Sequence, residues 1–373
     1  MITKPIGLYI HVPFCLRKCA YCDFCSFPID SVLKREEYIS SLCLEIEGYK
    51  NRGISVNSIF FGGGTPSLLT TSEIEKIVSF VRKTFSVCDD LEFTIEANPK
   101  TLSKEKLYGL IGLGVNRLSI GLQSIHENEL KMLGRIHSYK DFVEMFLLAR
   151  EVGFDNINVD FMYGIPGQTK ESFENTLSTI MSLSPEHISL YGLILEEGTP
   201  LYDARESMTF PSEDTECDMY YYAANFLRKH GYSHYEISNY AREGRECAHN
   251  LKYWRCEEYI GFGLSAYSYF DGKRYGNTNK LDEYLSGNYL EYDSVELTDL
   301  NSSAYEYVML GLRLKEGISL SEYSARFGKS FLVGREEVVE KFIDSGYLKQ
   351  DDDRLYLTDQ GMYISNYILN ELI

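Results

Sequence analysis

The sequence predicts an α/β protein built around an incomplete (β/α)6 barrel of the TIM-like type, followed by a small winged-helix-like α+β module. Three observations predict this fold. Short β-rich runs alternate with helical stretches from residue 6 to about 195, an order typical of parallel sheets. Polar residues recur at the carboxyl ends of those runs, where barrels carry functional groups. After about Leu300 the pattern changes to successive helical stretches followed by a candidate hairpin.

The alternating part gives its elements in order. The candidate strands are Gly7–His11, Ser58–Phe61, Leu91–Glu96, Arg117–Gly121, Ile157–Met162 and His187–Leu190. The segments with helical periodicity between them are Arg35–Tyr49, Thr71–Phe85, Lys104–Leu113, Ser138–Val152 and Lys170–Leu183. Strands separated by helices at this spacing form right-handed βαβ units, and six such units make an incomplete barrel.

Three regions follow from these patterns. Residues 1–200 hold the barrel core, residues 201–299 form an irregular extension rich in Tyr, Ser and Gly, and residues 300–373 form the C-terminal module. The module reads as three helical stretches and a hairpin in "LKQDDDRLYLT". A winged helix suggests DNA binding, but residues 301–373 contain eight basic and twelve acidic side chains. Because a phosphate-binding surface needs an excess of positive charge, we expect a lid or a docking module instead.

Composition excludes several classes of partner. The net charge of −18 argues against nucleic acid and against an anionic membrane surface. No apolar run approaches the ~18 residues of a membrane span, and the N-terminus lacks the pattern of a signal peptide. We therefore expect a soluble cytoplasmic protein without a membrane span.

Three cysteines carry the most specific signal. Cys15, Cys19 and Cys22 are spaced C-x-x-x-C-x-x-C, and three thiolates on one loop can hold three irons of a [4Fe–4S] cluster while the fourth iron stays open. With Cys25 or His11 the same residues could make a zinc site, but zinc sites usually pair two C-x-x-C motifs. A disulfide framework is disfavoured by the odd number of nine cysteines and the absence of a secretory signal.

A glycine run follows the second candidate strand. Gly62, Gly63 and Gly64 precede Thr65 and Pro66. Glycines let the backbone approach a ligand that any Cβ would exclude, although a tight strand-to-helix turn explains the same residues equally well.

Four polar residues lie at or after the ends of other strands. Glu96, Gln123 and Asp160 follow apolar runs, and Arg135 comes after the fourth strand. Carboxylate and amide oxygens can bind ribose hydroxyls, and an arginine can receive a carboxylate with two hydrogen bonds. Each residue alone fits a structural role, but the four repeat one location in the barrel, which favours a ligand site.

The motifs resemble a known family. The cysteine spacing resembles that of the radical S-adenosylmethionine (SAM) enzymes. In order, "LYIHVPFC", "CAYCDF", "GGGTP", "IEANP", "LSIGLQS", "LGRIH", "NVDFMYGIPGQT" and "YGLILEEGTPL" resemble the oxygen-independent coproporphyrinogen III dehydrogenases and their relatives, the HemW-type haem chaperones. The resemblance covers nearly the whole chain and implies a radical SAM barrel.

The resemblance also implies ligands for particular residues. In that family three cysteines, here Cys15, Cys19 and Cys22, bind the cluster, and its open iron chelates SAM. The positions that match SAM contacts of the family are Tyr9, Gly63, Gly64, Thr65, Glu96 and Arg135. Gln123 and Asp160 match positions that in the dehydrogenases help to hold a second SAM. Tyr21 and Phe24 are rings beside the cluster that can pack on adenine.

One segment favours the chaperone branch. His249, Asn250, Tyr253 and Trp254 form the H-N-x-x-Y-W pattern found in the haem chaperones. An imidazole can ligate haem iron and aromatic rings can stack on a porphyrin, although a histidine beside aromatic residues is more often structural. On a helix, His249 and Tyr253 would share a face.

Two departures from the dehydrogenases point the same way. Only fourteen residues precede Cys15, whereas the dehydrogenases resemble longer proteins with an N-terminal extension. Cys25 is displaced by one residue from their fourth cysteine, so we expect it to be a bystander. Cys247 and Cys256 flank the H-N-x-x-Y-W segment and are alternative thiolate ligands.

Three functions remain open from the sequence. The leading hypothesis is a [4Fe–4S]- and SAM-binding chaperone that binds haem and passes it to an unidentified acceptor protein, with a flavodoxin- or ferredoxin-type electron donor. The alternative is an enzyme that oxidatively decarboxylates coproporphyrinogen III in haem biosynthesis. A third is an iron–sulfur scaffold with neither activity.

Overall fold

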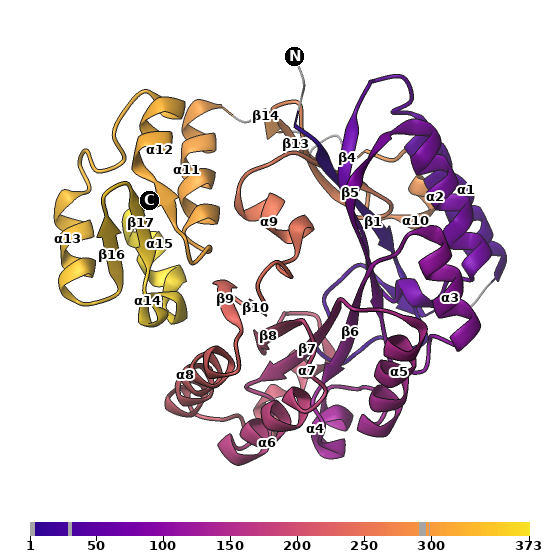
Figure 1. The fold of residues 1–373 in the computed structure, drawn as a ribbon, viewed down its shortest axis with the longest axis horizontal. Helices are drawn as coiled ribbons and strands as arrows, with labels where there is room; N and C mark the ends of the chain where they lie inside the picture. The colour runs from indigo at the N-terminus through magenta and orange to yellow at the C-terminus, as the bar shows by residue number, and fades with distance from the viewer. Residues whose placement is uncertain (1–3, 29–31, 291–295, 298) are drawn as a thin grey trace.

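A twelve-stranded sheet organises the protein (Figure 1). The computed structural model describes residues 4–28, 32–290, 296–297 and 299–373. The six central strands of the sheet each pair in parallel with the next. They are β1 (Ile6–Val12), β4 (Ser55–Gly63), β5 (Ser86–Ala97), β6 (Arg117–Gln123), β7 (Ile157–Tyr163) and β8 (His187–Gly192). The predicted parallel sheet is confirmed.

The predicted helices connect these strands. They are α1 (Val32–Glu47), α2 (Thr71–Thr84), α3 (Lys104–Leu113), α5 (Tyr139–Val152) and α6 (Lys170–Met181), with the short η1 (Pro66–Leu68) and α4 (Glu127–Met132) added. Local signals set their ends. Thr70 and Ser138 form capping boxes at the starts of α2 and α5, and Gly114 and Gly153 end α3 and α5 in the left-handed conformation.

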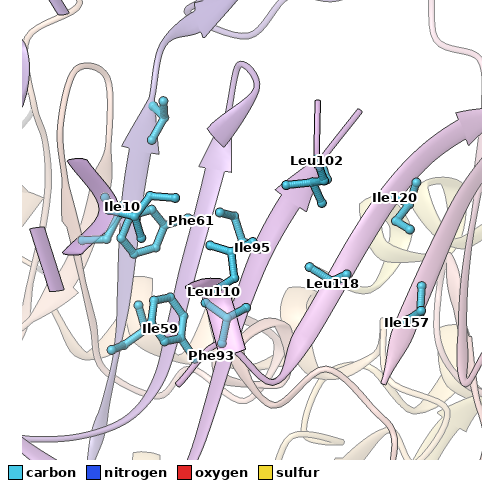
Figure 2. Packing of buried hydrophobic residues seen from close by; sticks show 14 of the residues in the cluster. Ile10, Ile59, Phe61, Phe93, Ile95, Leu102, Leu110, Leu118, Ile120 and Ile157 are labelled. Atoms are coloured by element: carbon cyan, nitrogen blue, oxygen red, sulfur yellow. The ribbon is translucent and has the colours of Figure 1, made fainter. Parts of the chain in front are cut away.

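Along most of each central strand, successive side chains point to opposite faces of the sheet. Ile59 and Phe61 on β4, Phe93 and Ile95 on β5, and Leu118 on β6 belong to the hydrophobic core (Figure 2). The residues between them point to the other face, because successive side chains of a strand lie on opposite sides. That other face is the interior of the barrel, and most of its side chains on β5 to β8 are polar.

The described part of residues 201–299 is more regular than its composition indicates. It forms α7 (Pro200–Asp203), η2 (Arg205–Ser207), α8 (Glu213–Lys229), β9 (Ser233–Glu236), β10 (Asn239–Ala241), α9 (Ala248–Trp254), β11 (Tyr259–Phe262), β12 (Tyr267–Phe270), β13 (Lys273–Gly276), α10 (Leu281–Leu285) and β14 (Glu296–Leu297). The strand β11 pairs in parallel with β1, and β10 pairs antiparallel with β8. Strands of three or four residues form because they pair with an existing edge of the sheet. Their own sequences therefore carry only a weak strand signal.

The C-terminal module has its own core. It contains α11 (Leu300–Gly311), β15 (Ile318–Ser319), α12 (Leu320–Phe327), α13 (Glu336–Asp344), β16 (Leu348–Asp351), β17 (Arg354–Leu357), α14 (Asp359–Tyr363) and α15 (Ser365–Leu372). The predicted hairpin is confirmed as β16–β17, which forms a three-stranded sheet with β15. Asp359 forms ion pairs with Lys315 and with Arg228 of α8, and this pairing ties the module to the barrel.

Within the described ranges, no helix combines the length and the apolar character that crossing a membrane requires.

A buried carboxyl on α1 connects this helix to the added edge of the sheet. Glu45 accepts hydrogen bonds from the Gly263 amide at 2.9 Å, the Tyr284 hydroxyl at 2.6 Å and the Asn277 amide at 2.6 Å. Burial raises the pKa of Glu45 to about 7 despite these hydrogen bonds. A raised folded-state pKa stabilises the protein at low pH, and this contribution is lost as the pH rises from about 4.5 to 7.

We therefore expect Glu45→Gln to change how stability depends on pH. Relative to the variant, the wild-type free energy of unfolding should fall by about 3 kcal/mol between pH 4.5 and pH 7.5, at about 1.4 kcal/mol per unit of pKa shift. Denaturant titrations of both proteins at the two pH values measure this difference. A difference that stays constant across the range would contradict the protonation of Glu45 in the folded state.

Candidate functional site

One cavity of about 470 Å³ collects almost every residue that the sequence singled out. It is lined by Tyr9, Cys15, Cys19, Tyr21, Cys22, Phe24, Gly63, Gly64, Thr65, Glu96, Gln123, Arg135, Asp160, His249, Asn250 and Tyr253. These residues come from or directly after strands of the barrel, from the cysteine loop, from α9 and, for Arg135, from the segment after α4 (Glu127–Met132). Trp254, Cys25, Cys247 and Cys256 do not line this cavity.

The cysteine loop is held at both ends. Cys15 ends β2 (Phe14–Cys15), which pairs with β3 (Phe27–Pro28), so that the intervening chain forms a closed loop. In the middle of the loop, the Ala20 amide donates to the Leu133 carbonyl at 3.0 Å. All three cysteines of the motif are free thiols that face the same cavity.

Two side chains donate hydrogen bonds to sulfurs of this loop. The Thr65 hydroxyl lies 3.7 Å from Cys15 Sγ, and Arg135 Nη1 lies 3.4 Å from Cys19 Sγ. Burial raises the pKa of Cys22, so this thiol by itself resists ionisation, and a bound cation lowers the pKa of a coordinating thiol. Donors beside thiolates are the environment that iron–sulfur ligands use. The three cysteines therefore fit a cluster by their chemistry.

The zinc alternative finds no support in the geometry. His11 uses both ring nitrogens, Nε2 toward the Cys25 carbonyl at 2.8 Å and Nδ1 toward the Tyr9 hydroxyl at 3.1 Å. Cys25 does not line the cavity. Among the residues that the structure describes, no group of three or more His, Cys, Asp or Glu side chains is arranged to hold one metal ion.

The glycine run packs against the cysteine loop. Gly63 has a φ of 108°, and a Cβ at this position would lie 2.5 Å from the His11 ring. A Cβ at Gly64 would lie 2.7 Å from the Phe14 carbonyl oxygen. The Gly63 amide donates to Glu96 Oε2 at 3.2 Å. Only glycine fits at these two positions, because the backbone must pass between the loop and the cavity.

Glu96 and Asp160 are paired acids within the cavity. Burial raises the pKa of Glu96 to about 8, and the nearby Asp160 raises it further, against the opposing hydrogen bond from Gly63. Burial also raises the pKa of Asp160, which accepts from Asn158 Nδ2 at 2.6 Å and from the Ser119 hydroxyl at 3.3 Å. At neutral pH Glu96 is therefore mostly protonated, and it can donate as well as accept hydrogen bonds.

Arg135 and Gln123 have fixed positions at the rim. Arg135 Nη2 donates to Asn98 Oδ1 at 2.5 Å and to the Gly121 carbonyl at 2.7 Å. Gln123 has a φ of 71°, and the pairing of β6 with β7 shifts register between Gly121 and Gln123. Such a bulge turns a side chain toward a site, and left-handed backbone costs a residue other than glycine about 1–3 kcal/mol.

The helix α9 brings the H-N-x-x-Y-W segment into the barrel. Glu92 of β5 accepts hydrogen bonds from the first amides of the helix, Ala248 N at 2.9 Å and His249 N at 3.0 Å. The helix contacts β4 on one side and α11 of the C-terminal module on the other (Figure 1). It also lies against Gly7, where a Cβ would be 3.0 Å from Lys252.

His249 is the most enclosed member of this segment. Its side chain is 1% exposed, its ring stacks on Phe60 at 5.3 Å, and burial lowers its pKa to about 3. Nδ1 lies 3.0 Å from the Ser58 hydroxyl and Nε2 lies 2.7 Å from the Tyr253 hydroxyl. The imidazole is thus neutral, and both nitrogens have partners. The expected i, i+4 pairing of His249 and Tyr253 is confirmed.

Trp254 lies apart from these residues. It lines a second cavity, between the end of α9 and the C-terminal module, together with Cys256. Its neighbour in that region is the Arg313 guanidinium, 5.6 Å from the ring centre. Cys247 lines neither cavity; it is buried, and its thiol lies 3.5 Å from Glu92 Oε1.

Several lining residues were missed by the sequence analysis. They are Arg117 and Ser119 on β6, Asn158 on β7, Ser189 and Tyr191 on β8, Phe60 on β4 and Asn98 after β5. The signal that finds most of them is the alternation within each strand, since they occupy every second position beside Glu96, Gln123 and Asp160.

Comparisons with known proteins agree with this arrangement. Residues 9–180 match the radical SAM superfamily, and residues 299–364 match the HemN C-terminal domain. The chain is 36% identical to a Bacillus subtilis protein named heme chaperone HemW, over 98% of both chains. It is 35% identical to the Escherichia coli protein of the same name, over 98% of this chain and 97% of that one.

A solved structure has the same fold over almost the whole of this chain. The coproporphyrinogen III oxidase HemN from Escherichia coli superimposes with a TM-score of 0.87, over 99% of this chain and 90% of that one. The two sequences are 23% identical, so this likeness concerns the fold.

Proposed function

The chain belongs to the radical SAM superfamily and, within it, to the HemW family, and from this premise we propose that it binds haem and passes it to acceptor proteins. In this proposal a [4Fe–4S] cluster and SAM are its resident cofactors. The observation that carries the proposal is the single cavity into which the cysteine loop and α9 both project.

The cluster end of the cavity supports the cofactor assignment. Cys15, Cys19 and Cys22 would hold the cluster, which when bound supplies an open iron for SAM and a store of one electron. The residues proposed to contact SAM are Tyr9, Gly63, Gly64, Thr65, Glu96 and Arg135, and Tyr21, Phe24, Gln123 and Asp160 line the same cavity.

The α9 end of the cavity supports the haem assignment. A neutral imidazole is the form of histidine that binds metal, and burial keeps His249 neutral. Iron would take the place of Tyr253 at Nε2 or of Ser58 at Nδ1, and the remaining hydrogen bond would then orient the ring. Asn250 and Tyr253 line the same end, while Trp254 would act from the second cavity.

A haemin titration tests this proposal. We expect the wild-type protein to shift the Soret band of haemin, and His249→Ala to weaken haemin binding at least about tenfold, because a metal ligand is lost. His230→Ala is the matched control, since His230 is exposed at the end of α8 and should leave binding unchanged. An unchanged haemin spectrum with the wild-type protein would refute the chaperone function.

The alternative activity, oxidative decarboxylation of coproporphyrinogen III, gains no specific support. The likeness to the oxidase concerns the fold, and the curated relatives at 36% and 35% identity carry the chaperone name. We expect anaerobic incubation with SAM, a reductant and coproporphyrinogen to leave the porphyrinogen unconverted.

A further inference from the structure

A buried guanidinium in the deep part of the cavity has the carboxylates Glu92 and Asp160 nearby, and against the effect of burial their charges raise its pKa, but it forms no direct ion pair with either. Arg117, the first residue of β6, is 2% exposed and lines the cavity wall. Its one recorded hydrogen bond, from Nη1 to the Thr94 hydroxyl, is 3.5 Å long, and its Nε has no partner. None of the ion pairs among the described residues involves Arg117.

The acids nearest to Arg117 are engaged elsewhere. Glu92 accepts from the amides of Ala248 and His249 at the start of α9, and Asp160 accepts from Asn158 and Ser119. An arginine does not lose its charge in a protein, and a buried charge is costly unless it is paired. The arrangement leaves a planar cation facing a cavity, with hydroxyl and amide groups beside it.

We infer that Arg117 receives a carboxylate of the ligand that fills the deep part of the cavity. A guanidinium binds a carboxylate with two parallel hydrogen bonds, and Ser119, Asn158 and Ser189 on the same wall supply further polar partners. Resting on the proposed function, the carboxylate is a propionate of the porphyrin.

The position of Arg117 separates this carboxylate from that of SAM. Arg117 begins β6 and Gln123 ends it, six residue steps of about 3.3 Å each, or roughly 20 Å of strand. Arg135, which is among the residues proposed to contact SAM and can receive its carboxylate, contacts Cys19 of the cysteine loop instead. His249 in contrast lines the same part of the wall, because its amide donates to Glu92 of β5 and the Arg117 guanidinium contacts Thr94, two residues along the same strand. A porphyrin whose iron is near His249 can thus place a propionate at Arg117.

Esterified haemin tests the inference without any substitution. We expect the reconstituted wild-type protein to bind haemin at least about tenfold more tightly than haemin dimethyl ester, because a hydrogen-bonded charge pair is lost with the ester. Equal affinities would overturn the role of Arg117. Failure to bind either compound would instead refute the proposed function itself.

The affinities of wild type and Arg117→Gln for haemin and for its dimethyl ester form a thermodynamic cycle. The glutamine variant should bind haemin and the ester equally, near the affinity of the ester for the wild type, while Arg117→Lys should recover part of the preference. Arg150→Gln is the matched control, because Arg150 pairs with Glu186 outside the cavity at 2.8 Å and should keep the wild-type ratio. Persistence of the wild-type ratio in Arg117→Gln would overturn the inference.

SAM binding measurements distinguish a haem propionate from the methionine carboxylate of SAM as the partner of Arg117. Binding of SAM and of decarboxylated SAM should be the same in Arg117→Gln as in the wild type. A loss of SAM affinity in Arg117→Gln, with the haemin affinity unchanged, would place the methionine carboxylate at Arg117 and overturn the assignment to a propionate.

Discussion

Replacement of Cys19 by alanine is expected to reduce bound iron from about four atoms per chain to nearly none after anaerobic reconstitution. Cys19 lines the cavity, and Arg135 donates a hydrogen bond to its sulfur. With two thiolates left, the cluster would lose a ligand that no neighbouring side chain replaces, because Cys25 lies outside the cavity lining. Iron and labile sulfide assays, together with the visible absorption of the cluster, measure the loss.

Cys25→Ala is the matched control for this substitution. The residue belongs to the same loop, is partly buried, and offers the same loss of one thiol. It should retain the full iron content. If Cys25→Ala lost iron as completely as Cys19→Ala, the assignment of the cluster to Cys15, Cys19 and Cys22 would be incorrect.

Gly63→Ala is expected to have the second-largest effect, a destabilisation of at least about 3 kcal/mol together with the loss of SAM binding. Its left-handed φ of 108° costs alanine about 1–3 kcal/mol, and the added methyl group meets the His11 ring at 2.5 Å. The His11 ring cannot move aside freely, since Tyr9 and the Cys25 carbonyl hold both of its nitrogens. Denaturant unfolding and SAM titration measure the two effects.

A second glycine distinguishes the cost of a positive φ from the cost of the steric clash with His11. Gly53 also has a positive φ, 69°, but a Cβ there meets nothing within 4 Å. Gly53→Ala should therefore show only the cost of the backbone conformation and should bind SAM normally. Equal losses of stability in the two variants would show that contact with the His11 ring does not restrict Gly63.

The six central strands could be predicted because each is long, apolar on one face and followed by a periodic helix. In β6, Leu118 and Ile120 pack in the core while Arg117 and Ser119 face the cavity. The same alternation that identifies a strand also marks its cavity residues. Considered only at the carboxyl ends of the strands, the alternation identifies Gln123 but not Arg117.

The added edges could not be predicted in the same way. β11 has four residues, one of them Gly261, and its order comes from pairing with β1 some 250 positions away in the chain. Local sequence does not encode such a pairing. The separation of Trp254 from His249 has a similar origin, because five steps along a helix turn a side chain by about 140° and direct it toward the C-terminal module.

The cavity shared by the cysteine loop and α9 would couple the binding of a ligand at one end to the binding of a ligand at the other. A volume of about 470 Å³ lies within the range that accommodates one small ligand, and the cysteine loop and α9 face the same space. In the proposed function, SAM bound at one end would therefore change the binding free energy of haem at the other end. Thermodynamic linkage then requires haem to change the binding free energy of SAM by the same amount. Binding of haem and binding of SAM would then share one coupling free energy.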